Sequence, residues 1–104
     1  MDGFDRFGDQ PSFPMFTERL GGRFRVVAVP GTVVELTLVE ATSLPSRGNT
    51  MRPVPFSIVF RGPTERRLPQ GTYPFEHVAL GAFEMFIVPI APDEHGPRYE
   101  AVFN

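Results

Sequence analysis

Short apolar runs with a period of two residues, separated by turns, constrain the fold of this chain more than any other feature. The run PFSIVFRG is followed by LPQGTY, FEHVALG and AFEMFIVPI, and APDEHGP then leads into the closing RYEAVF. Alternate side chains of a strand point to opposite faces, so this pattern indicates strands with one buried face. Glycine and proline between the runs supply the turns. The pattern predicts antiparallel strands and contains no catalytic signature.

The first half of the chain adds two strands and the only segment with helical character. Residues 32–42 alternate most clearly, because Val34, Leu36 and Leu38 share one face. The segment PMFTERL at 14–20 predicts one or two helical turns that end at Gly21. The expected strands are 23–29, 32–42, 56–61, 73–77, 82–90 and 98–103. We therefore predict an all-β fold, a small antiparallel β-barrel or sandwich of about six strands with one short N-terminal helix.

Two of these strands carry a further expectation about their place in the sheet. Pro74 cannot donate a hydrogen bond to a ladder, so the strand at 73–77 is expected either to lie at a sheet edge or to start irregularly. Residues 82–90 are apolar except for Glu84, which is typical of a central strand.

The composition predicts one domain with a phenylalanine-rich core. A chain of 104 residues with 41% hydrophobic residues suffices for a single core. It has 11 Phe and no Trp, and each buried aromatic ring hides roughly 150 to 250 Å² of surface. Residues 14–104 are expected to form this all-β domain. Residues 1–13 mix Asp, Gly, Gln and Pro with Phe and are predicted to be an N-terminal arm, either flexible or docked on a partner.

Charge and residue usage argue against several function classes. The absence of Cys excludes disulfides and thiolate chemistry, and all ten basic residues are Arg. The net charge of −2 and the lack of an Arg run longer than Arg66–Arg67 disfavour nucleic-acid binding. No apolar run resembles a signal peptide or membrane span, so the default expectation is a cytoplasmic protein without a membrane partner. No cofactor is predicted.

The candidate contact surface combines the arm with two long, proline-punctuated loops. Loops of this length often serve in binding. The loops span 43–55 and 61–71, and the candidate contact residues are Phe4, Phe7, Phe13, Arg47, Arg52, Arg66 and Arg67.

Acid–base chemistry and metal binding are the weaker interpretations of the titratable residues. Glu76 and His77 point to opposite faces of a regular strand, so they do not cooperate directly. Glu84 and Glu100 meet them only if the last three strands are neighbours. No compact metal-ligand spacing and no nucleophile motif is present, which predicts no catalytic or metal site.

Several short strings in the second half resemble a known family. They are RGP at 61–63, LPQGTY at 68–73, Glu76 with His77, Leu80 with Gly81, Glu84 followed by FIVP at 86–89, and YEAVFN at 99–104. They resemble a family of short bacterial proteins catalogued as a domain of unknown function, from about Phe16 to Asn104. The resemblance implies a compact all-β domain with no assigned activity and no functional residues to carry over. It also implies an association with phage-tail-like or tail-collar systems.

Two functional hypotheses follow. The first is a non-enzymatic protein-interaction or assembly module that uses the arm and the loops to bind a protein partner or to self-associate. The second is a small-ligand-binding barrel or minor hydrolase that uses His77 and a nearby carboxylate. A filled barrel interior argues against the second hypothesis.

Overall fold

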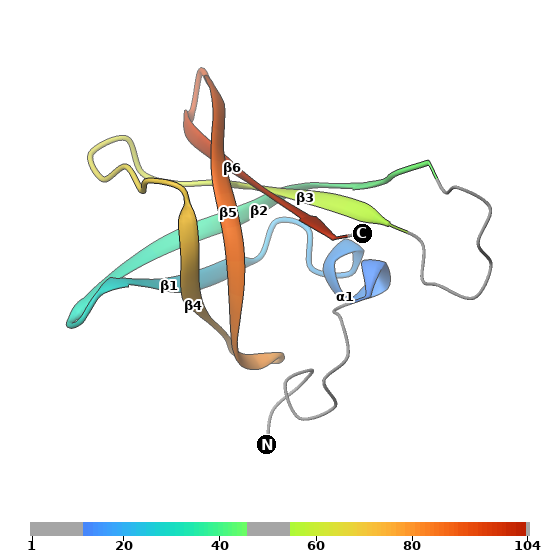
Figure 1. Cartoon of the computed structure of the whole chain (residues 1–104), viewed down its shortest axis with the longest axis horizontal. Coiled ribbons are helices and arrows are strands. Elements are labelled where there is room, and N and C mark those ends of the chain that lie inside the picture. Colours follow the sequence, from blue (N-terminus) through green and yellow to red (C-terminus); the bar gives the residue numbers. More distant parts are fainter. Residues whose placement is uncertain (1–11, 46–54, 104) are drawn as a thin grey trace.

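The computed structural model describes residues 12–45 and 55–103, and this part of the chain forms one short helix and six strands (Figure 1). The elements are α1 (Phe13–Thr17), β1 (Arg23–Val29), β2 (Thr32–Ser43), β3 (Phe56–Arg61), β4 (Gly71–His77), β5 (Gly81–Asp93) and β6 (Gly96–Phe103). The predicted all-β class with one short N-terminal helix is confirmed.

The strands close into an antiparallel barrel in the order β1-β2-β3-β6-β5-β4, which decides between barrel and sandwich. In this order every strand has a neighbour on both sides, although a strand that is longer than its neighbour keeps an unpaired stretch. The expectation that β5 is a central strand is confirmed, because β5 pairs with both β4 and β6. Strand β4 is not an edge strand, because it pairs with both β1 and β5. The start of β4 is irregular at Pro74. The β1–β4 ladder consists of Arg25↔Glu76 and Val26↔Phe75, so it ends at the residue next to the proline.

Strand β5 is apolar on both faces but buried on only one of them. Phe83, Met85 and Ile87 point inward and are buried, as the period of two predicts. The outward Phe86 is 52% exposed, so the apolar character of this strand does not come from burial on both faces.

Phenylalanine rings fill the interior of the barrel, as the composition predicted. The ring of Phe60 lies 5.2 Å from Phe24 and 5.4 Å from Phe75, measured between centroids. Phe75 in turn stacks on Phe83 at 5.8 Å. Together with Leu36, Leu38, Ile58 and Ile87, all fully buried, these rings form one continuous core.

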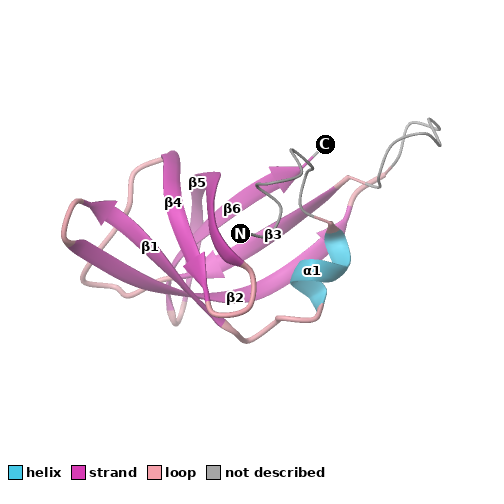
Figure 2. Ribbon diagram, turned by 90° about the horizontal axis from the view of Figure 1, so that it is seen from below, coloured by secondary structure: helices cyan, strands magenta, loops and turns pink. Residues whose placement is uncertain are grey.

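The barrel has two dissimilar ends (Figure 2). The helix end carries α1, the end of β2 with the start of β3, and the β4–β5 turn at 78–80. The loop end carries the β1–β2 turn at 30–31, the β3–β4 loop at 62–70 and the β5–β6 turn at 94–95. Gly31 takes a φ of 84° in the first of these turns, a conformation that glycine adopts without strain.

The helix begins one residue earlier and ends sooner than the sequence predicted. It spans Phe13–Thr17, with Ser12 extended before it and Pro14 in its first turn, where a missing N–H costs nothing. Phe13 therefore belongs to the folded domain and not to the arm. Its ring lies 5.3 Å from that of Phe56 and packs against the core.

Candidate functional site

The loop at 62–70 is tied to the barrel on both sides of its tip. The Leu68 side chain is buried, and its N–H donates to the Tyr99 hydroxyl at 3.0 Å. The Tyr73 hydroxyl donates to the Pro69 carbonyl at 2.6 Å. At the other side, the Gly62 N–H donates to the Pro97 carbonyl at 2.9 Å. The tip of this loop is therefore presented from a fixed base.

Gly62 lies directly against core side chains, which would have to move to admit a larger residue. A Cβ atom at this position would lie 2.8 Å from Leu36 Cδ2 and 3.2 Å from Tyr99 Cε2, both in the core. The chain can therefore leave β3 directly over the end of the core, because no side chain stands in the way.

Arg66 and Arg67 differ from the other arginines of the described part. The described part contains seven arginines, and the five others each have a carboxylate oxygen within 4.0 Å; the pairs are Arg19–Glu18, Arg23–Glu35, Arg25–Glu76, Arg61–Asp93 and Arg98–Glu40. Arg66 and Arg67 are exposed at the loop tip, and within residues 12–45 and 55–103 no carboxylate pairs with either guanidinium.

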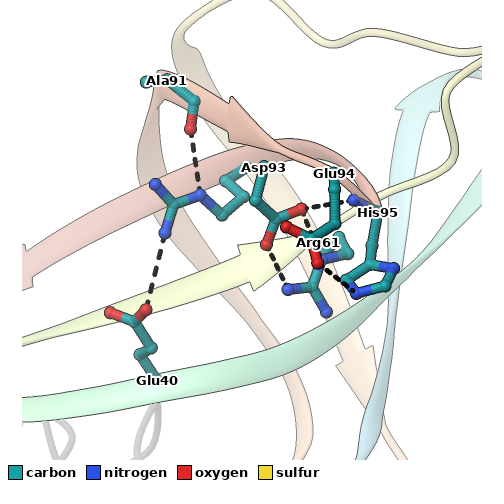
Figure 3. A network of polar contacts seen from close by, with 7 residues as sticks. Glu40, Arg61, Ala91, Asp93, Glu94 and His95 are labelled. Atoms are coloured by element: carbon teal, nitrogen blue, oxygen red, sulfur yellow. Dashed lines mark hydrogen bonds and ion pairs between the residues drawn. The ribbon is translucent and has the colours of Figure 1, made fainter.

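Beside the loop, Arg61 is fully paired with a carboxylate in a network of polar contacts (Figure 3). The Arg61 guanidinium makes a two-pronged contact with the Asp93 carboxylate, through Nε to Oδ1 at 3.1 Å and through Nη2 to Oδ2. Asp93 Oδ1 also accepts the His95 N–H at 2.8 Å. The bond from Arg61 is the main cause that holds the pKa of Asp93 well below its usual range. The pKa of Arg61 is raised by the same bond.

Arg98 makes a separate set of polar contacts across the barrel wall. Its Nε donates to the Ala91 carbonyl at 2.9 Å, and its Nη1 lies 3.5 Å from Glu40 Oε2 (Figure 3). Because β3 lies between β2 and β6, the Arg98–Glu40 contact spans the outer face of β3. The outward Val59 is buried next to it.

An open groove lies between β2 and the base of this loop. Its walls are Val33, Val34, Glu35 and Thr37 on the β2 side, and Arg61, Gly62, Pro63 and Arg66 on the loop side. Val33 is 46% exposed and gives the groove an apolar wall. Arg61 is neutralised by Asp93 and Glu35 is paired with Arg23, so Arg66 contributes the unpaired charge. The arrangement can receive an anionic group next to an apolar one.

The comparisons with known proteins define the family but not the activity. Residues 11–103 match the family described as "Domain of unknown function (DUF6916)". The chain belongs to this family. No curated protein and no solved structure matches the chain. The predicted resemblance to a domain family of unknown function is confirmed, and any function must be argued from the geometry of the domain itself.

The structure divides the predicted contact residues of this DUF6916 domain. Arg66 and Arg67 lie at the loop end, whereas Phe13 packs at the helix end. Phe4, Phe7, Arg47 and Arg52 lie outside the described residues. Leu44 and Pro55, which flank the segment 46–54, are hydrogen-bonded to each other at 2.8 Å at the helix end. The candidates that can be placed therefore do not form one surface.

The contacts of His77 give it a structural role in the β4–β5 turn. Its ring lies 4.5 Å from the Phe24 ring, and its Nδ1 accepts the N–H groups of Ala79 at 2.9 Å and Leu80 at 3.2 Å. Burial lowers the pKa of His77, and the nearby Arg19 charge lowers it further. The imidazole thus holds the β4–β5 turn in its neutral form.

The carboxylates near His77 are engaged elsewhere. A second groove is lined by Arg23, Arg25, Glu35, Glu76, His77 and Val78. Its two carboxylates, Glu35 and Glu76, pair with Arg23 and Arg25. Glu84 and Glu100 lie opposite Pro74 and Val88 in the sheet, away from this groove. This geometry offers no support for an acid–base pair.

Residues 12–45 and 55–103 contain no cluster of three His, Asp or Glu side chains placed to hold a metal ion. None of the helices in this part of the chain has the length and apolar character needed to cross a membrane.

The sequence predicted Arg66 and Arg67 as contact residues, but it did not predict the groove. Its walls come from β2 and from residues 61–66, which are far apart in the chain. The sequence does contain one signal for the groove, which is a difference in strand length: the alternating run at 32–42 is nearly twice as long as the next run at 56–61. Such a mismatch leaves part of the longer strand without a partner.

Proposed function

We propose that this domain is a non-enzymatic protein-interaction module, and that its contact surface is the loop end with Arg66 and Arg67. The observation that carries the proposal is the contrast among the arginines. Five of the seven in the described part lie within 4.0 Å of a carboxylate oxygen of the same chain, and the two at the tip of an anchored loop do not.

The chemistry of arginine favours an acidic partner. A guanidinium presents several N–H donors in a planar fork that matches a carboxylate, and it stays charged at any physiological pH. The loop is held by Leu68 and by the hydroxyls of Tyr99 and Tyr73, so binding orders little additional backbone. The net charge of the whole chain is −2, so attraction to an acidic partner is local to this end.

The partner is either another protein or a second copy of the chain, since both can present carboxylates. A role as an accessory of a phage-tail-like or tail-collar assembly is the finer form of this proposal, and it rests on the family resemblance alone.

The test compares two double variants that each remove two positive charges. Arg66→Gln with Arg67→Gln removes the unpaired arginines. Arg19→Gln with Arg25→Gln removes two paired ones, whose carboxylate partners Glu18 and Glu76 do not line the groove. Each tagged protein is used for affinity purification from the native host with quantitative mass spectrometry. Light scattering at several concentrations measures self-association. We expect the first variant alone to lose bound proteins or oligomers, with thermal stability close to that of the parent.

Two results would count against the proposal. Equal recovery of partners by the parent and by the Arg66→Gln, Arg67→Gln variant would show that these arginines do not bind them. Equal losses in both double variants would show a general effect of net charge. A truncation that tests the arm must end before Ser12, because Phe13 packs in the core.

A further inference from the structure

Strand β2 extends beyond the strand that pairs with it. The β2–β3 ladder ends at Thr37↔Arg61, whereas β2 begins at Thr32 and pairs with β1 along its whole first half. Residues 32–36 thus have a paired side toward β1 and an unpaired side. The open groove described above runs along the unpaired side, with Arg61, Gly62, Pro63 and Arg66 opposite.

The direction of the backbone groups along this side follows from one hydrogen-bonded position. The Leu38 N–H donates to the Gly22 carbonyl at 2.9 Å, and the Leu38 carbonyl accepts the Gly21 N–H at 2.7 Å, so both groups of Leu38 face the β1 side. Backbone groups alternate in direction along a strand, and the register from Thr37 to Val33 is regular. Leu36 and Val34 therefore face β1, and Val33 and Glu35 face the groove.

The two groove-facing residues have backbone groups available for a ligand. Thr37, which points the same way, pairs with Arg61 of β3. Within the part of the chain that the structure describes, no strand pairs with Val33 or Glu35 on that side. Four hydrogen-bonding groups, two N–H and two C=O, thus line one wall of the groove. An unpaired strand edge of this kind is a template for another strand.

We propose that the groove binds an extended acidic segment of a partner protein as an added strand on β2. The main chain of the segment pairs with Val33 and Glu35, and an acidic side chain reaches the Arg66 guanidinium. An apolar side chain rests on Val33 and Pro63. This inference rests on the proposed function, because both use Arg66 as the anchor for a carboxylate.

Charge decides the chemistry of the occupant. Three charged side chains line the groove, and two of them already have partners, Arg61 with Asp93 and Glu35 with Arg23. The remaining charge is that of Arg66, so a basic segment is disfavoured and an acidic one is favoured. Strand addition gives affinity through the main chain and specificity through alternate side chains, which matches a groove with both elements.

The experiment uses random octapeptides displayed on phage, selected against the immobilised full chain. Enriched peptides are synthesised and measured by fluorescence anisotropy, and each is then N-methylated at one amide at a time. We expect enrichment of acidic residues alternating with apolar ones. N-methylation at every second central amide should weaken binding about tenfold, because it removes a hydrogen bond to β2, and methylation at the other amides should have little effect.

Three protein variants sharpen the test. Val33→Pro removes a groove-facing N–H without breaking the ladder to β1 and should weaken binding more than Val33→Ala, which removes only the side chain. Arg66→Gln should weaken acidic peptides about tenfold, the effect of losing one charge-assisted contact. Because the methylated peptides leave the protein unchanged, the test does not depend on the folding of Val33→Pro.

The outcomes separate this inference from the proposed function. Acidic peptides that lose affinity on Arg66→Gln but tolerate N-methylation at every amide would overturn strand addition and leave the acidic contact standing. Peptides that bind equally well to the parent and to Arg66→Gln would overturn the acidic recognition in both. Failure to enrich any peptide over the bare support would overturn the groove as a peptide site.

Discussion

The two ends of the barrel are closed by different means. At the helix end Phe16 lies 5.9 Å from both Phe56 and Phe103 and 6.3 Å from Phe24, so α1 covers the core with aromatic rings. At the loop end the closing contacts are polar or mixed, with Leu68 bonded to Tyr99 and Arg61 to Asp93. One end is a continuation of the core, and the other is a hydrogen-bonded cover.

The difference explains where an interaction site can lie. The contacts of α1 with the core are between aromatic rings, and their contribution comes from burial of apolar surface. The loop end needs directed bonds to hold its chain, and the same irregular path leaves Arg66 and part of the β2 edge unpaired. We infer that the helix end mainly stabilises the domain and that the loop end is the one suited to binding.

The largest expected effect is at the helix end. Phe16→Ala removes a fully buried ring that contacts three other rings, so we expect it to lower the free energy of unfolding by about 3 to 5 kcal/mol. Urea unfolding followed by circular dichroism measures the change. The matched control is Phe86→Ala, since Phe86 is half-exposed on the outer wall, and its cost should stay below about 1 kcal/mol. Similar costs for the two variants would mean that α1 does not close the core.

The second effect tests the loop end. Tyr99→Phe keeps the buried ring but leaves the Leu68 N–H without its acceptor, and we expect a loss of about 1 to 2 kcal/mol. Hydrogen exchange of the Leu68 amide should accelerate by more than the global loss explains. Tyr73→Phe is the control, because the Tyr73 hydroxyl bonds the exposed side of the same loop and should cost less. Unchanged exchange at Leu68 would show that the hydroxyl does not anchor the loop.

The sequence was sufficient for those features that depend on neighbouring residues. Val34, Leu36 and Leu38 are buried as predicted, because the period of two is local and one face of a strand must be covered. The phenylalanine-rich core follows from composition in the same way. The exposure of Arg66 and Arg67 follows from a polar, proline-punctuated loop.

Features that depend on contacts between residues far apart in the chain could not be predicted from the sequence. The sequence placed Phe13 in an arm, because its ring partner Phe56 lies in a strand far along the chain. The bond that anchors the loop joins Leu68 to Tyr99 across a separation of 31 residues. Closure of the barrel by β1 and β4 is equally non-local. The groove on β2 depends on all of these at once, so it appears only in the assembled fold.

The smallest effect concerns pH and separates the two ends by their chemistry. The bond from Arg61 lowers the pKa of Asp93 below the value of about 3.9 that an unfolded chain would show. The folded state therefore binds this proton less readily, and the stabilisation by Asp93 is fully present above pH of about 4 and is lost as the pH falls toward the folded pKa. Asp93→Asn should cost stability at pH 7 and progressively less below pH of about 4.

Phe16→Ala is the control for this pH dependence. Its ring contacts carry no charge, so its cost should be the same at pH 7 and at pH 3 for as long as the domain stays folded. Urea unfolding of the parent and both variants at several pH values provides the test. A cost of Asp93→Asn that does not change with pH would mean that the Arg61–Asp93 pair contributes through shape and not through charge. The loop end would then be closed by packing, as the helix end is.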